Sequence, residues 1–152
     1  PSSGQYIPPA DVAQPPIPGG ILRVLLGEIG KEAGLLACPI TSQQDITYLV
    51  VTLSLVSRWS FTPPDPHSTA FAFVFSGAAN VQGEAGGASL MVLGDKGDIV
   101  VETTDQPAEV LIGTAAPHPY PLVLGPSSVH TNAASLAAAQ TRIRQIRPNL
   151  PK

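Results

Sequence analysis

The chain has 152 residues, of which 43% are hydrophobic and 12% are charged, and its formal net charge is -3. This length fits one domain with a single core, and the mild acidity argues against direct binding of nucleic acid, which requires clustered Lys and Arg. The charged fraction lies well below the roughly 25% of an average soluble domain. Either part of the surface is apolar and covered by something else, or the composition is simply rich in Ala and Gly.

Cysteine content and the length of the apolar runs indicate the compartment. Cys38 is the sole cysteine, so no internal disulfide forms and nothing implies secretion. We expect this thiol to be buried and inert. No apolar run approaches the ~20 residues that a membrane helix requires. We therefore expect an intracellular, cytoplasmic protein without membrane contact, or a nuclear one if the source is a eukaryote.

Residues 1–20, PSSGQYIPPADVAQPPIPGG, are rich in proline and show no periodic apolar pattern. Proline fixes φ and lacks a backbone donor, so this segment is predicted to be an extended lead-in or linker. The chain begins at Pro1 without an initiator Met. We interpret it as a processed or excised piece of something longer.

From Ile21 onward, short β-type runs follow one another, punctuated by Gly, Pro and Asp. The predicted strands are ILRVLLGEIG, ITYLVVTLSLV, TAFAFVFSG, ASLMVLG, GDIVVETT and AEVLIGTA. In the third run, Phe71, Phe73 and Phe75 share one face, and Ala72 and Val74 share the other. Strands at this spacing predict an all-β domain over residues 21–131, an antiparallel sandwich or barrel.

The end of the chain has a different periodicity. In NAASLAAAQTRIRQI, Asn132 or Thr131 can cap a helix. Apolar residues recur at helical spacing, giving one stripe: Leu136, Ala139, Ile143 and Ile146. This pattern predicts a helix over residues 132–147 that packs on the barrel, followed by a tail at 148–152.

Three stretches in this order resemble a cupin, and more narrowly the carboxy-terminal cupin domain of the pirin family. They are PGGILRVLLGEIG, then VTLSLVSRWSFTPPDPHSTAFAFVFSGAANVQGE, and finally LVLGPSSVHTNAASLAAAQTRI. The resemblance implies a cupin-type jelly roll with a C-terminal α-helix. It also implies a parent with two cupin domains, in which iron is held by histidines and a glutamate of the amino-terminal domain, absent here. Whole pirins act as nuclear cofactors of transcription factors, and some oxidise quercetin.

Metal-binding cupins place His-x-His, then three or four residues, then Glu, then six residues, then Gly. With that Gly at Gly77, the Glu position falls on Ala70. The two His positions fall on Pro66 or Asp65 and on Pro64 or Pro63. Asp65 and the nearby His67 are the candidate metal ligands, although His67 is one residue out of phase, which on a strand turns a side chain to the opposite face.

The second cupin motif should supply a further His, and GDKGDIVVETTDQPAEVLIG contains none. The three or four converging N or O donors of a metal site are therefore missing. His67, His118 and His130 lie far apart in sequence, and we interpret them as solvated or capping residues. We expect no metal, no cofactor and no catalytic residue in this chain.

Three functions remain open. The first is a structural and protein-interaction role, with the amino-terminal cupin of the same or another protein as partner, and with homodimerisation through bare β edges. The second is a solitary small-molecule-binding cupin. Its apolar cavity would be lined by residues that otherwise form plain core: Leu53, Leu55, Phe71, Phe73, Phe75 and Met91. The third is an enzyme, a quercetin dioxygenase-type oxidoreductase. Trp59 and Phe61 are expected at the barrel mouth.

Overall fold

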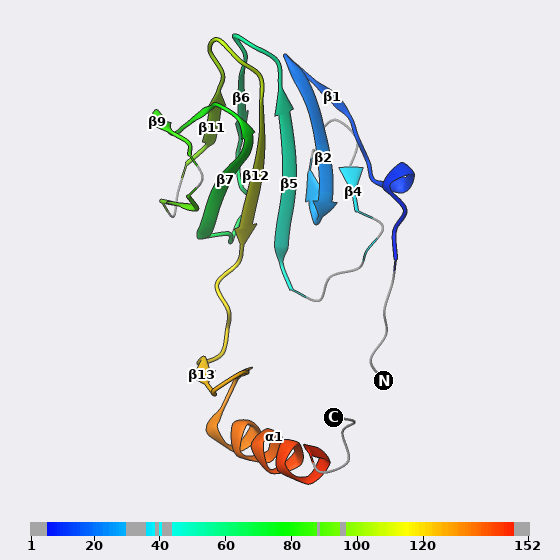
Figure 1. The fold of residues 1–152 in the computed structure, drawn as a ribbon, viewed down its shortest axis with the longest axis vertical. Coiled ribbons are helices and arrows are strands. Elements are labelled where there is room, and N and C mark those ends of the chain that lie inside the picture. Colours follow the sequence, from blue (N-terminus) through cyan, green and yellow to red (C-terminus); the bar gives the residue numbers. More distant parts are fainter. Residues whose placement is uncertain are drawn as a thin grey trace. The chain divides into compact units, whose positions relative to one another are not determined.

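The computed structural model describes residues 6–29, 36–38, 40, 44–87, 89–94 and 97–147. The chain divides into two compact units, Pro1–Pro117 and His118–Lys152. The first consists of antiparallel strands, and the second contains a short hairpin and a helix (Figure 1). Each unit is described by itself below.

The first unit contains two larger antiparallel sheets (Figure 1). The six-stranded sheet has the order β1-β2-β5-β12-β7-β10. Its strands span, in that order, Pro16–Ile17, Gly20–Leu26, Ile46–Leu53, Ala108–Ala115, Thr69–Gly77 and Met91–Leu93. The four-stranded sheet has the order β6-β11-β8-β9 and spans Arg58–Phe61, Ile99–Glu102, Asn80–Val81 and Glu84–Ala85. The predicted all-β antiparallel sandwich is confirmed.

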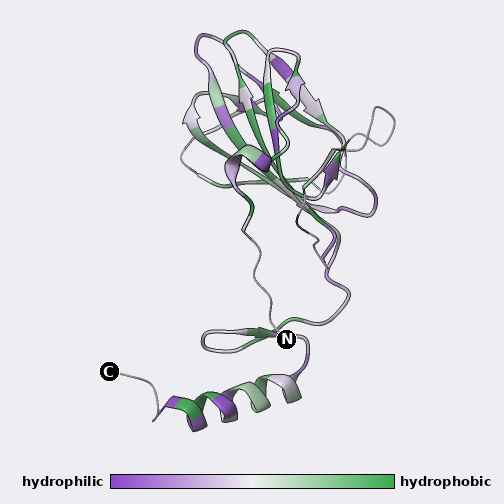
Figure 2. Cartoon of the chain, turned by 90° about the vertical axis from the view of Figure 1, so that its right-hand side faces the viewer, coloured by the Kyte–Doolittle hydropathy of each residue, from purple (hydrophilic) through white to green (hydrophobic). Residues whose placement is uncertain are grey.

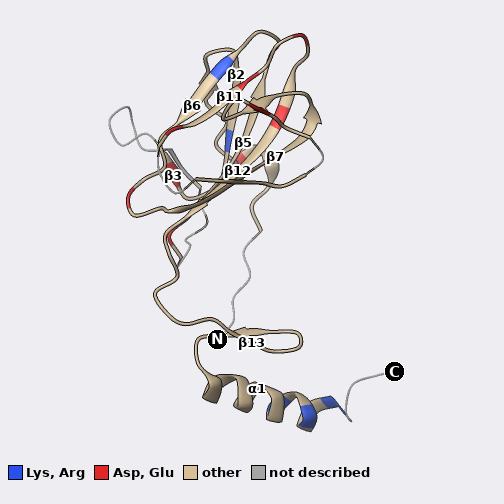
Figure 3. Cartoon of the chain, turned by 90° about the vertical axis from the view of Figure 1, so that its left-hand side faces the viewer, with Lys and Arg blue, Asp and Glu red and all other residues tan. Residues whose placement is uncertain are grey.

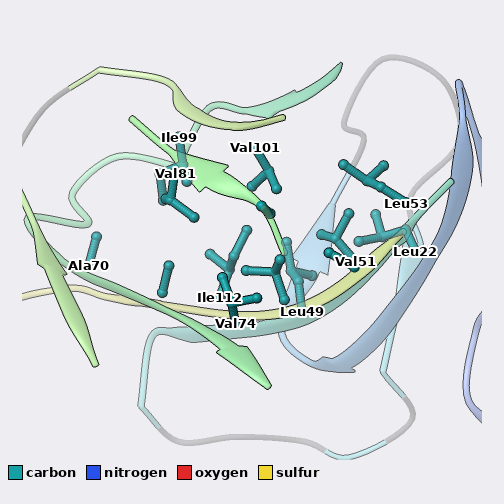
Figure 4. Packing of buried hydrophobic residues seen from close by; sticks show 14 of the residues in the cluster. Leu22, Leu49, Val51, Leu53, Ala70, Val74, Val81, Ile99, Val101 and Ile112 are labelled. Atoms are coloured by element: carbon teal, nitrogen blue, oxygen red, sulfur yellow. The ribbon is translucent and has the colours of Figure 1, made fainter. Parts of the chain in front are cut away.

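The core lies between these two sheets, because alternate residues of each strand point inward. In β5, Leu49, Val51 and Leu53 are fully buried. Val81 and Val101 approach them from the four-stranded sheet (Figure 4). The β-branched runs that predicted these strands therefore supply the side chains that hold the sheets together.

Strand β7 corrects one prediction about the interior. Its phenylalanines share a face as expected, but Ala70, Ala72 and Val74 are the buried residues. Phe71 and Phe73 are only partly buried, and Phe75 is 46% exposed. Side chains alternate across a strand, so Phe71 and Phe73 point away from the core. Phe75, beside the register shift between Glu109 and Val110, is exposed, so none of the three lines the interior.

The remaining expected cavity residues have different positions. Leu55 lies in the turn after β5 and is 60% exposed, so it lines no cavity either. Leu53 is part of the packed core, and Met91 packs against that core while remaining partly exposed. The inward positions of these strands thus form a packed core.

Part of the proline-rich segment belongs to the six-stranded sheet. A 3-10 helix spans Pro9–Asp11, and β1 pairs with β2. In addition, the Leu22 amide donates to the Pro15 carbonyl and the Val24 amide donates to the Ala13 carbonyl. The sheet therefore begins before residue 21. Prolines are tolerated in β1 because it is an edge strand, where the backbone N–H that proline lacks is not needed to pair with a further strand. A small pair, β3 (Glu28–Ile29) and β4 (Leu36–Ala37), follows β2.

The second unit consists of the hairpin β13 (Val123–Leu124) and β14 (Val129–His130) and the helix α1 (Ala133–Ile146). Asn132 caps the helix as predicted, since its side chain accepts from the Ser135 amide at 2.8 Å. The positive residues lie toward the helix C-terminus (Figure 3), where the macrodipole favours them. Among the described residues, no helix has the length and apolarity needed to cross a membrane. Packing of α1 on the barrel remains a prediction.

The buried core predicts a large cost for one truncation. Leu49→Ala should lower the free energy of unfolding by about 2–5 kcal/mol, because it removes a fully buried side chain and leaves a cavity. Leu55→Ala, at an exposed turn, should change it by less than about 0.5 kcal/mol. Urea denaturation followed by circular dichroism measures both. Equal losses in the two variants would contradict this placement of the core.

Candidate functional site

A pocket of about 300 Å³ opens in the first unit beside the segment that connects β6 to β7. Its walls come from that segment, from the start of β7, from the turn between β8 and β9, and from the region around β10 and β11. They combine polar side chains (Thr62, Asp65, His67, Ser68, Thr69 and Gln82) with apolar or small residues (Pro63, Pro66, Ala70, Leu93, Gly94, Gly97 and Ile99). None of the six residues expected to line an apolar cavity is part of these walls.

His67 is the buried polar residue of this pocket, and its side chain is 0% exposed. Its Nδ1 lies 2.7 Å from Oγ1 of Thr114, and its Nε2 lies 2.9 Å from Oδ1 of Asp45. A carboxylate can only accept, so Nε2–H donates to Asp45, and Nδ1 pairs with the Thr114 hydroxyl. Both ring nitrogens of His67 therefore have a hydrogen-bond partner.

This hydrogen-bonded group joins three distant parts of the chain. Asp45 immediately precedes β5, Thr114 lies in β12, and His67 belongs to the segment before β7. The His67 amide also donates to the Pro64 carbonyl at 2.8 Å. The imidazole thus ties the pocket wall to two neighbouring strands. Sequence spacing gave no indication of Asp45 and Thr114, because strand pairing alone brings them to His67.

The other candidate ligand, Asp65, lines the same pocket but is exposed. Within the described part of the chain, no group of three or more His, Cys, Asp or Glu side chains is placed to hold a metal ion. His118 and His130 belong to the second unit, where His118 Nδ1 lies 2.9 Å from the Tyr120 carbonyl oxygen and His130 Nε2 lies 2.8 Å from Oγ of Ser128. That a metal is absent remains a prediction.

Most of the motif positions identified in the sequence line this pocket. Ala70, at the expected Glu position, is buried and forms part of its wall. Pro63 and Pro66, at expected His positions, line it as well. Gly77, the last residue of the motif, has φ +71°, and a Cβ there would lie 1.8 Å from the Pro107 carbonyl oxygen. Only glycine fits at that position.

Two further residues from the sequence lie on β6. The rings of Trp59 and Phe61 are parallel within 1°, with centroids 6.0 Å apart. Both are partly buried and pack against the core cluster. The pair therefore contributes to packing at the edge strand of the four-stranded sheet.

Comparison with solved structures identifies the fold. Quercetin 2,3-dioxygenase from Acinetobacter baumannii matches with a TM-score of 0.79 and 19% identity, over 94% of this chain and 49% of that chain. The chain has the cupin fold. A second structure of that enzyme gives 0.74 and 18% over 93% of this chain and 48% of that chain. A Geobacillus kaustophilus protein gives 0.62 and 15% over 77% of this chain and 48% of that chain.

This chain spans about half the length of each of these three solved structures. No protein-family model matches it, and no curated protein matches it. The fold is therefore established from structure.

The His67 group predicts a stability effect. His67→Ala should lower the free energy of unfolding by about 2–3 kcal/mol, because it leaves the buried Thr114 hydroxyl without its partner. Thr114→Val should cost less on its own. A double-mutant cycle between the two positions should give a coupling energy of at least about 0.5 kcal/mol. His118→Ala, at an exposed position, is the matched control, and additive losses at 67 and 114 would contradict the interaction.

Proposed function

We propose that this chain is the metal-free cupin half of a two-domain, pirin-like protein, where it supports a metal-bearing amino-terminal cupin and provides a surface for protein contacts. One observation carries the proposal. The positions at which a metal-binding cupin would place its ligands lie mostly at the pocket wall: Ala70 at the Glu position, Pro66 or Asp65 at one His position, and Pro63 at the other in one of the two spacings. Of these side chains, only that of Asp65 has a donor atom.

The donors that remain in the pocket support the same conclusion. A transition metal needs three or four N, O or S ligands that converge on one point. Of the two candidate ligands, Asp65 is exposed. The other, His67, already uses both ring nitrogens in hydrogen bonds to Asp45 and Thr114. Ligation by His67 would require breaking one of these bonds.

The rest of the proposal concerns the longer parent protein. The chain resembles about half of a quercetin 2,3-dioxygenase. We infer an intracellular parent whose iron and any quercetin dioxygenase activity reside in its other cupin domain, with contacts to transcription factors as in the pirin family. In this arrangement the present chain is not an enzyme by itself.

Metal analysis tests the proposal. The chain, expressed with iron in the medium and dialysed, should retain less than about 0.1 equivalent of iron, copper or zinc, because the pocket lacks a converging ligand set. Mass spectrometry of the metals measures this content. A cupin with a known resident metal serves as the positive control. Near-stoichiometric metal that His67→Ala removes would overturn the proposal.

The pocket favours a second candidate function, the binding of a small molecule. Its volume of about 300 Å³ reaches the lower end of the usual range for ligand sites. The walls combine apolar surface from Leu93 and Ile99 with the Asp65 carboxylate and the Gln82 amide. This mixture suits a planar ligand with hydroxyl groups, such as a flavonol, whose hydroxyls can donate to Asp65.

A thermal-shift titration tests this second function. Flavonols should raise the melting temperature in a concentration-dependent way, since a ligand at about 100 times its dissociation constant adds about 2.7 kcal/mol. Asp65→Ala should weaken the shift by removing the carboxylate from the wall. Asp105→Ala, in an exposed turn away from the pocket, should leave it unchanged. If no concentration shifts the transition, the pocket does not bind flavonols.

A further inference from the structure

The second unit, His118–Lys152, has no interior of its own in the part that the structure describes. None of its described residues, 118–147, is buried. Leu136 packs on the hairpin, since a Cβ on Gly125 would lie 2.6 Å from its Cδ1. Beyond this contact, Leu124 is 75% exposed and Ile143 is 47% exposed. Segments shorter than about 40 residues rarely bury enough surface to be stable alone, so the apolar side chains of this unit need a further surface.

Charge is divided unevenly between the two units. All 11 acidic residues of the chain lie before residue 118, together with four of the eight Lys and Arg, so the first unit carries a formal charge of -7. Residues 118–152 contain no Asp or Glu and carry +4, from Arg142, Arg144, Arg147 and Lys152. These cations have no carboxylate side chain within their own unit. We call residues 118–147 the basic arm.

The helix α1 of the basic arm carries both hydrophobic and hydrophilic residues (Figure 2). Successive residues advance about 100° around a helix. The apolar stripe identified in the sequence, which includes Ile143 and Ile146, therefore has Arg142 along one side and Arg147 along the other. Such a stripe suits a partner surface that is apolar and bordered by carboxylates.

The pocket of the first unit has this combination. Asp65 lies in its wall beside apolar residues, and no Lys or Arg is among the described residues of the wall. Two further carboxylates bond to wall residues, since Asp98 accepts from the Thr62 hydroxyl at 2.6 Å and Asp45 accepts from His67 at 2.9 Å. All three aspartates are exposed. We call the pocket with these three carboxylates the acidic pocket.

The cations of the first unit leave this negative charge in place. Among its described residues, Arg23 pairs with Glu109 and Arg58 pairs with Glu102. In the same described part, no Lys or Arg forms an ion pair with a carboxylate of the acidic pocket. The acidic pocket can therefore attract the cations of another surface, over about 10 Å in 0.1 M salt.

The connection between the units favours a second copy as the source of the arm. Pro117, Pro119 and Pro121 occupy alternate positions, and each fixes its own φ and restricts the residue before it. A proline-rich segment of this kind is a semi-rigid spacer. It starts beside the acidic pocket, because the Ala116 amide donates to the Asp45 carbonyl at 2.9 Å. To reach the pocket of its own chain, the arm would have to reverse within this stiff segment, whereas the arm of another copy needs no reversal.

We propose that the basic arm of one copy docks on the acidic pocket of a second copy, and that the exchange is reciprocal. Reciprocal exchange forms a closed two-fold dimer, in which Ile143 and Ile146 contact the apolar wall and Arg142 pairs with Asp65. A helix of 14 residues is about 21 Å long, so each contact is small, and the association is weak and sensitive to salt. This proposal rests on the interaction role above and names its surface, but it does not depend on the absence of a metal.

Sedimentation of the full chain over a concentration series tests the exchange. In about 20 mM salt the mass should rise with concentration from 15.7 kDa toward twice that value, and about 0.5 M salt should raise the dissociation constant at least about tenfold. Arg142→Glu and Asp65→Lys should each weaken association by a similar factor, because each places like charges opposite each other. Asp105→Lys, in an exposed turn away from the pocket, is the matched control and should leave association unchanged.

Mixing the two variants identifies the surfaces in contact. The Arg142→Glu chain keeps an intact pocket and the Asp65→Lys chain keeps an intact arm, so their equimolar mixture should associate at concentrations where neither variant does alone. A chain that carries both substitutions should also regain association, because opposite charges face each other again. A folding defect would produce neither result.

Three outcomes overturn the proposal. The first is a chain that is monomeric at every concentration in low salt, whether its arm then rests on its own first unit or on another acidic partner. The second is a dimer that both variants leave intact, and the third is a mixture of the variants that stays monomeric. Retained metal would overturn the proposed function and would leave these masses unchanged.

Discussion

The small inward side chains of β7 are the constraint on which the rest of the first unit depends. Ala70, Ala72 and Val74 face the four-stranded sheet, and together with Val81 and Val101 they belong to one buried cluster. Successive side chains of a strand lie on opposite faces of the sheet. Because these small residues face inward, the phenylalanines of β7 lie on the outer face. The packed interior and the apolar exterior of the six-stranded sheet are consequences of the same register.

The same register also explains where the pocket and its polar side chains lie. The space between the sheets is occupied by aliphatic side chains, so the pocket opens at one end, beside the segment before β7. There, one buried imidazole holds the wall to two strands through Asp45 and Thr114. In the described residues, every buried side-chain nitrogen or oxygen has a hydrogen-bond partner. The pocket wall is therefore held by a satisfied polar network, which favours a structural role for His67.

The two outer surfaces of the barrel unit differ in a way that bears on function. The four-stranded sheet presents the Arg58–Glu102 ion pair and further polar residues, whereas the six-stranded sheet presents aromatic and aliphatic side chains beside the Arg23–Glu109 pair. Apolar side chains that gather on one outer surface of a domain are typical of a surface that contacts another molecule.

The sequence by itself determined the runs that contain β2, β5, β7, β10, β11 and β12, and the helix with its Asn132 cap, because alternation and capping are local properties of the chain. It did not predict β6, β8 and β9, which form the four-stranded sheet together with β11. The motif spacing also left Asp65 as the one ligand position with a donor atom, beside Ala70 and the prolines. Only the tertiary structure decided which face of β7 is buried, since the period is two on either face and burial depends on the opposing sheet. Likewise, the Asp45–His67–Thr114 group exists because strand pairing joins residues that have no fixed spacing in sequence.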